Sequence, residues 1–176
     1  MSTTVTITYE IRAARCCIDD KPGFLRVLTE TARQFNTHII CFNADMLAGK
    51  RHAESAMQHA IRSFDAGTAI SKTLEMEALL YAAGSRQCSV AALFGFHEGE
   101  NCLWVCCYPL RNGVWDALTA IMHFEGEGSW DFIDDKKREH LLKIFNISPE
   151  ELSSLDNKDR VTDLVLERVA LLDVLR

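Results

Sequence analysis

The sequence has few of the features that interrupt or extend a globular chain. Its 176 residues include three prolines and nine glycines, so we expect no long linker and no low-complexity tail. No run of about 18 apolar residues occurs, which argues against a membrane-spanning helix. The first residues lack a basic segment followed by an apolar core, so we expect no secretory signal. Length and composition favour one domain, residues 1–176.

The chain also lacks an excess of positive charge. Lys and Arg number 19 against 25 Asp and Glu, and the formal net charge is −6. This balance excludes a protein that binds nucleic acid over its whole surface. A local basic patch is still compatible with it.

Motifs of catalysis and of metal binding are missing from the sequence. It contains no GxxxxGK[ST], GxGxxG, HExxH or CxxC motif. His52 and His59 stand seven apart, which is too wide for a chelating pair, and we interpret them as surface or half-buried histidines. Asp131, Asp134 and Asp135 are of the residue type that binds a divalent metal, but helix capping explains Asp134 and Asp135 more simply. We expect no metal and no cofactor.

Seven cysteines are present, and their odd number argues against a complete disulfide framework. Such a chain suits the reducing cytoplasm. Cys106 and Cys107 lie within an apolar run, which is the wrong setting for a reactive thiolate. Cys88 follows Arg86-Gln87 and is the least implausible nucleophile. A small thiol-dependent enzyme that uses Cys88 or Cys107 therefore stays open as an alternative, as does a stand-alone ligand-binding module.

Hydrophobic periodicity alternates between the strand and helix patterns. Val5, Ile7 and Tyr9 alternate with threonine, which predicts a strand within residues 4–18. The continuous apolar run 102–108 is typical of a strand buried on both faces. Further strands are expected at 38–42 and 130–133, and helices at 23–35, 49–64, 71–84, just after 85, and at 113–124, 134–145, 148–151 and 161–175. The predicted fold is α/β (α+β), a small mixed or antiparallel sheet flanked by several helices.

The last expected helix, residues 161–175, is apolar on two faces. One broad stripe consists of Val161, Leu164, Val165, Val169, Leu172 and Leu175. A second stripe, nearly opposite, consists of Leu166, Ala170 and Val174. One stripe can pack on the domain, and the other is either sandwiched against a neighbouring element or docks a second chain.

Basic and hydrogen-bonding residues gather in two stretches. Lys50-Arg51-His52 stands at an expected helix start, where positive charge opposes the helix dipole. Ser71 and Ser85 are expected N-caps, with Lys72 and Arg86 beside them. Free backbone N–H groups and cations at such positions can receive an anion. The alternative is a set of capped helices with solvated charges.

A longer pattern resembles a known family. The run Ile70-Ser71-Lys72-Thr73-Leu74-Glu75-Met76-Glu77, followed by Gly84-Ser85-Arg86-Gln87, resembles the signature of the smallest KEOPS subunit. This is the family of the p53-related-protein-kinase-binding protein, and its archaeal members are the more similar. Asn43-Ala44-Asp45, Lys50-Arg51-His52 and Val165 to Leu172 agree as well. The resemblance covers most of the chain from residue 11 onward.

The resemblance implies a non-catalytic accessory subunit of KEOPS, which installs threonylcarbamoyl (t6A) on tRNA through a different, ATPase-fold subunit. The small subunit binds the atypical protein kinase subunit and meets other KEOPS subunits indirectly. In archaeal members it also recruits the single-stranded 3′ CCA end of tRNA. The expected tRNA-binding residues are Lys50, Arg51, Ile70, Ser71, Lys72, Leu74, Arg86 and Gln87. The expected kinase-docking residues are Leu166, Val169, Ala170 and Val174.

Overall fold

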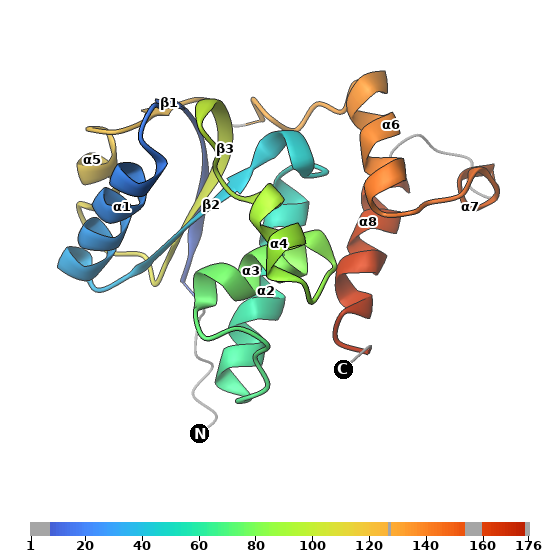
Figure 1. The fold of residues 1–176 in the computed structure, drawn as a ribbon, viewed down its shortest axis with the longest axis horizontal. Helices are drawn as coiled ribbons and strands as arrows, with labels where there is room; N and C mark the ends of the chain where they lie inside the picture. The colour runs from blue at the N-terminus through green and yellow to red at the C-terminus, as the bar shows by residue number, and fades with distance from the viewer. Residues whose placement is uncertain (1–7, 127, 154–159, 175–176) are drawn as a thin grey trace.

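A computed structural model describes residues 8–126, 128–153 and 160–174. The elements follow one another as β1 (Glu10–Ile18), α1 (Lys21–Phe35), β2 (His38–Asn43), η1 (Ala44–Met46), α2 (Lys50–Asp65), α3 (Leu74–Ala83), α4 (Cys88–Ala91), η2 (Ala92–Phe94), β3 (Gly99–Tyr108), α5 (Val114–Leu118), β4 (His123–Phe124), α6 (Asp135–Ile144), α7 (Pro149–Ser153) and α8 (Arg160–Leu171) (Figure 1). Over these residues the sheet has the order β2-β3-β1-β4, and every pair is antiparallel. The predicted α+β fold is confirmed, and the sheet is antiparallel rather than mixed.

Helices cover both faces of the sheet, and the strands alternate accordingly. In β3, Trp104 and Cys106 face the core formed with α2, α3 and α8, whereas Leu103, Val105 and Cys107 face a second core formed with α1 and α5. All five side chains are buried. The prediction that the apolar run 102–108 is buried on both faces is therefore confirmed.

Two expected elements are wrong. The helix expected over 113–124 ends at Leu118, and His123 and Phe124 form β4, which pairs with the outer edge of β1. Phe124 then packs edge-on against Trp115, with ring centroids 5.3 Å apart. The strand expected at 130–133 is turn and loop, because Asp131 is used to cap α2. In both places a tertiary contact outweighs the local pattern.

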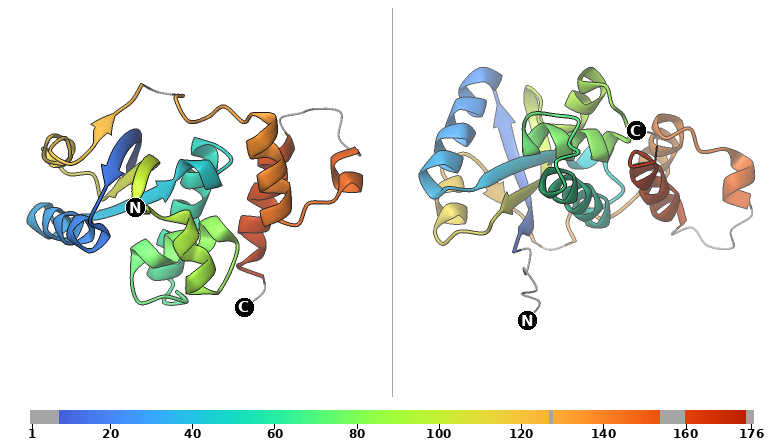
Figure 2. Two further views of the ribbon diagram at one scale, coloured as in Figure 1. Left: turned by 45° about the horizontal axis from the view of Figure 1, so that its top comes forward. Right: turned by 90° about the horizontal axis from the view of Figure 1, so that it is seen from below.

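The helices form groups along the long axis of the molecule. Figure 2 shows α6, α7 and α8 together at one end, away from α1 and α5. α8 contacts α2 and α3, which in turn contact β1 and β2 respectively. The residues of the expected docking helix are therefore close to the ends of α2 and α3, where the basic stretches lie. No helix in the described part of the chain is long and apolar enough to cross a membrane.

Candidate functional site

The inner face of α8 belongs to the core. Five residues of the broad stripe are buried, namely Val161, Leu164, Val165, Val169 and Leu172. The sixth, Leu175, lies outside the described residues. The expectation that Val169 contributes to kinase docking needs correction, because its side chain is fully buried and no partner can reach it on this face.

The outer face of α8 is open. Leu166 is half-buried and Ala170 is exposed, so the second stripe is not sandwiched against another element over this stretch. Val174 is 75% exposed and lies in the turn that follows the helix, because α8 ends at Leu171 rather than at residue 175. Leu171 is 43% exposed and adjoins this stripe. We call Leu166, Ala170, Leu171 and Val174 the outer row.

A hydrogen-bond network holds the C-terminal turn of α8 against α2 and α3. The Asp173 carboxylate lies 2.7 Å from His59 Nδ1 through Oδ2 and accepts a hydrogen bond from the Tyr81 hydroxyl through Oδ1. The Tyr81 hydroxyl also lies 2.7 Å from Ser63 Oγ, and the His59 ring stacks on the Tyr81 ring. His59 is half-buried, as expected from the sequence. The network fixes the position of the turn that carries Val174.

Arg168 joins the middle of α8 to the end of α6 and to α7, and Gly84 lets the end of α3 approach the same part of α8. Arg168 donates from Nε to the Phe145 carbonyl oxygen at 3.2 Å and from its guanidinium to Glu151 Oε1 at 2.6 Å. The hydrogen bond from Arg168 lowers the pKa of the Glu151 carboxyl. Gly84 caps α3 with a φ of 59°, and a Cβ at this position would lie 3.3 Å from the Arg168 carbonyl oxygen. The helix expected over 71–84 therefore ends where predicted, and Gly84 also allows the close approach of α8.

The first turn of α2 is capped from a distant loop. The cap residue Gly49 has no side chain to offer, and the Lys50 N–H donates instead to Asp131 Oδ1 at 2.8 Å. The Arg51 guanidinium lies 3.5 Å from Asp163 of α8. The two carboxylates offset the unfavourable position of Lys50 and Arg51 at a helix start. Asp131 therefore has a capping role, as Asp134 has for α6.

His52 is neither a surface nor a half-buried residue, and this expectation is wrong. Its ring is fully buried, where Nδ1 accepts a hydrogen bond from the Ala48 N–H at 3.0 Å and Nε2 lies 2.8 Å from the Ala82 carbonyl oxygen. Both contacts are satisfied by a neutral ring that carries its proton on Nε2. Burial lowers the pKa of His52 to about 4. The residue thus joins the start of α2 to the end of α3.

The loop before α3 is organised by a buried carboxylate. Glu77 is fully buried and accepts the N–H groups of Ile70 at 3.1 Å and Ser71 at 2.7 Å. Thr73, not Ser71, is the N-cap of α3, because its Oγ1 accepts the Met76 N–H at 3.2 Å. The Ser71 N–H is therefore already bonded, and the expectation that it can receive an anion is wrong.

The second expected cap is also absent. Ser85 Oγ accepts the Gln87 N–H at 3.1 Å, and the four-residue helix α4 begins only at Cys88. Leu74 is buried in the core and cannot support a base at the surface, so its expected role in tRNA binding needs correction. Four of the expected tRNA-binding residues are exposed in the loops that flank α3, namely Ile70, Lys72, Arg86 and Gln87.

The structure does not gather the eight expected tRNA-binding residues into one pocket. Lys50 and Arg51 begin α2, whereas Ile70 to Lys72 follow its other end. A helix of 16 residues is about 24 Å long, so these two groups lie far apart. Sequence reasoning missed Glu77 as the organiser of the loop. Its signal was an acidic residue among the apolar residues of a helix, where burial demands hydrogen-bond partners.

The thiols do not form a catalytic arrangement in the described part of the chain. Cys107 is fully buried, and burial raises its pKa to about 12, which keeps the thiol protonated. Cys88 is exposed, and no described hydrogen bond joins it to a histidine. Over the same ranges, no three His, Cys, Asp or Glu side chains lie close enough together to hold a metal ion.

Comparison with known proteins bears on the family of the chain. No curated protein matches the chain. A family model described as kinase binding protein CGI-121 matches residues 22–173, from the first turn of α1 to the turn after α8. The match includes the signature around α3 and the whole of α8. The chain therefore belongs to the kinase binding protein CGI-121 family, the KEOPS subunit family that its signature resembles.

Proposed function

We propose that this chain is a non-catalytic accessory subunit of a KEOPS complex, in which it binds the atypical protein kinase subunit and recruits the 3′ CCA end of tRNA for t6A modification. The observation that carries the proposal is the outer row of α8, an apolar surface on a firmly anchored helix in a family of kinase-binding proteins. Non-catalytic action agrees with the buried, protonated Cys107 thiol. We place the protein in the cytoplasm because its thiols are free.

The outer row suits a permanent protein interface. Its side chains are apolar although they face solvent, and the core packing of α8 gives no reason for this. The Asp173 network and Arg168 fix the helix before a partner arrives, so little ordering entropy opposes binding. We therefore propose that the kinase subunit docks on the outer row.

The kinase-docking proposal is tested with the double variant Leu166→Asp/Val174→Asp. Two carboxylates in an apolar interface should weaken binding of the purified kinase subunit by at least about a hundredfold in calorimetry. Leu93→Asp is the control, because Leu93 is 62% exposed and belongs to η2 rather than to α8. The circular dichroism spectrum should stay unchanged in both. Equal kinase affinity in the double variant and the control would contradict the proposal.

We propose that Lys72 and Ile70, before the start of α3, and Arg86 and Gln87, after its end, contact successive parts of the tRNA end. Both cations are exposed, and neither forms an ion pair with a described residue, so their charges are free to meet phosphate. Because the protein as a whole is acidic, this binding should be local, weak and sensitive to salt.

The tRNA proposal is tested with Lys72→Glu/Arg86→Glu against Lys136→Glu/Lys143→Glu, which changes the net charge equally on α6. Affinity for tRNA that ends in CCA should fall about tenfold or more in Lys72→Glu/Arg86→Glu alone, and the affinity of that variant should depend less steeply on salt. Kinase binding should be unchanged. An equal loss in both pairs, or the same affinity for tRNA without CCA, would contradict this placement.

A further inference from the structure

The free edge of the sheet faces an apolar hollow. Among the described residues β2 pairs with β3 alone, so its second edge carries backbone N–H and C=O groups that no other described strand binds. A hollow of about 520 Å³ follows this edge between α1 and α3. Ile39, Ile40 and Cys41 of β2 line it, and Leu25 of α1 and Leu79 of α3 contribute to its walls.

A second, positively charged hollow continues from the first. It has a volume of about 330 Å³ and includes Arg33, Arg111 and His38 in its lining, with no acidic side chain. Ala32 lines both hollows, so they adjoin near the start of β2. His38 is also paired with Glu75, which lines the apolar hollow, at 2.7 Å. The apolar hollow therefore ends beside two guanidinium groups. We call the two adjoining hollows together the slot.

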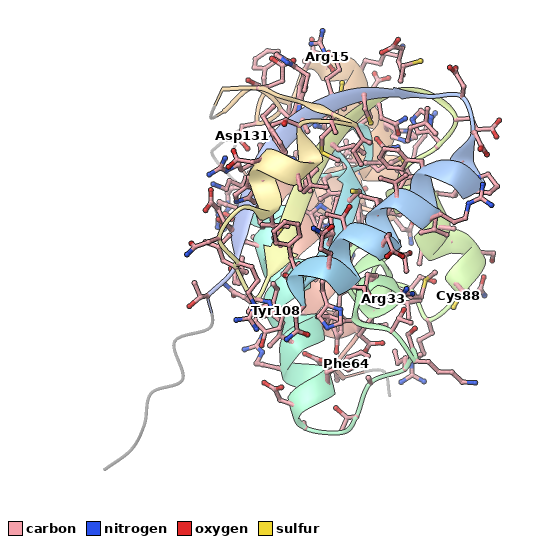
Figure 3. All side chains as sticks on the ribbon, turned by 90° about the vertical axis from the view of Figure 1, so that its left-hand side faces the viewer. Arg15, Arg33, Phe64, Cys88, Tyr108 and Asp131 are labelled. Carbon is pink, nitrogen blue, oxygen red and sulfur yellow. The ribbon has the colours of Figure 1, made fainter. Side chains whose placement is uncertain are left out.

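The two arginines are available to a ligand. Arg33 lies on the last turns of α1, on the side of the molecule seen in Figure 3. Its ion pair with Glu30 measures 3.2 Å between side chains that are both more than 70% exposed, and such a pair is weak. Arg111 donates from Nε to the Asn36 carbonyl oxygen, which orients its guanidinium without neutralising it.

We propose that this slot binds an extended peptide with a free C-terminal carboxylate. The peptide adds to β2 as an antiparallel strand, and its carboxylate binds Arg33 and Arg111. A peptide strand antiparallel to β2 runs from the Asn43 end of β2 to its His38 end, so the C-terminus of the peptide lies beside Arg33 and Arg111. Main-chain hydrogen bonds to β2 supply affinity, and alternate apolar side chains enter the slot.

Charge and shape select this occupant over other ligands. A carboxylate matches the fork of an arginine in geometry as well as in charge. The hollow beside it is apolar along the strand, and it is 520 Å³ in volume, which falls within the range of ligand sites. Leu25 is 52% exposed at the wall, so an apolar side chain of the peptide can pack against it. This site is separate from the outer row of α8, and it adjoins the proposed tRNA contacts at Thr73, which follows Lys72.

The test uses random heptapeptides displayed with free C-termini and panned against the full chain. The expected result is enrichment of peptides with apolar residues at alternate positions near the C-terminus. An enriched sequence, synthesised as the acid and as the amide, should bind about tenfold more tightly as the acid. No enrichment, or equal binding of acid and amide, would overturn the proposal.

Matched variants locate the binding on the protein. Arg33→Glu and Leu25→Asp should each weaken the synthetic acid about tenfold or more. Arg26→Glu and Val27→Asp are the controls, because these residues are exposed on the same helix and do not line either hollow. Kinase binding should be unaffected in all four, which also shows that they are folded. If the controls lose as much affinity as the slot variants, the peptide binds elsewhere and the proposal fails.

Discussion

The buried histidine of α2 gives a sharp prediction about stability and pH. His52 joins Ala48 and Ala82 through a neutral ring, and its pKa is lowered to about 4 by burial. In the unfolded chain a histidine has a pKa of about 6.5. Between these two values the unfolded state binds a proton that the folded state does not, so stability falls as the pH falls. The contribution of His52 is intact above about pH 6.5 and is lost towards pH 4.

The size of the effect follows from the two pKa values. Between pH 7 and pH 5 the unfolded histidine becomes almost fully protonated while the folded one stays neutral, which costs about 2 kcal/mol of unfolding free energy. His52→Gln is the matched variant. Its amide can accept from the Ala48 N–H and donate to the Ala82 carbonyl oxygen, but it does not titrate.

The measurement is urea unfolding, followed by circular dichroism, of both proteins at pH 7, 6 and 5. The wild type should lose about 2 kcal/mol more than His52→Gln over this range. Other titrating groups contribute equally to both proteins, including His38, whose pKa is raised by its hydrogen bond with Glu75, and therefore cancel in the difference. The same pH dependence in the two proteins would refute a neutral, buried His52.

Two further predictions concern packing and thiol chemistry. Gly84→Ala should lower the free energy of unfolding in urea by about 2 kcal/mol, because of the positive φ and the nearby Arg168 carbonyl. Gly67→Ala should lower it less, because Gly67 shares the positive φ but has no neighbour within 4 Å. Equal losses in the two variants would mean that α8 does not approach Gly84. With iodoacetamide, Cys88 should react and Cys107 should stay unmodified in the native protein by mass spectrometry, with kinase binding retained. Rapid labelling of Cys107, or loss of kinase binding, would favour the thiol-dependent alternative.

Much of the fold follows from local patterns. The apolar run of β3, the helix expected over 49–64 and the capping Asp134 of α6 are predicted correctly because each depends on neighbours within a few residues. The alternation of polar and apolar residues does not reveal a pairing partner, so β4 was read as part of a helix although Phe124 completes the edge of β1. Short elements of this kind depend on what the rest of the sheet leaves unpaired.

The candidate sites show the same division. Ser71 and Thr73 are both good N-caps by residue type, and the choice between them depends on Glu77, which lies in the core and binds the Ser71 N–H. His52 and Leu74 stand in stretches that appear polar and accessible, yet both are buried when α3 packs on its neighbours. Burial of a single side chain is a property of the packed molecule, and no local pattern contains it.

The sequence by itself determined the family, the α+β class and the two apolar stripes of the last helix, because signature, composition and periodicity are written in the chain. Only the tertiary structure decided which stripe faces solvent, since Val169 is buried by packing of α8 on α2 and α3 while Val174 stays exposed. It also separated Lys50 from Lys72 by the length of α2, and it brought Arg33 and Arg111, 78 positions apart, to one hollow. The physical reason is that side chains distant in sequence meet through burial and backbone pairing, which act between elements rather than along them.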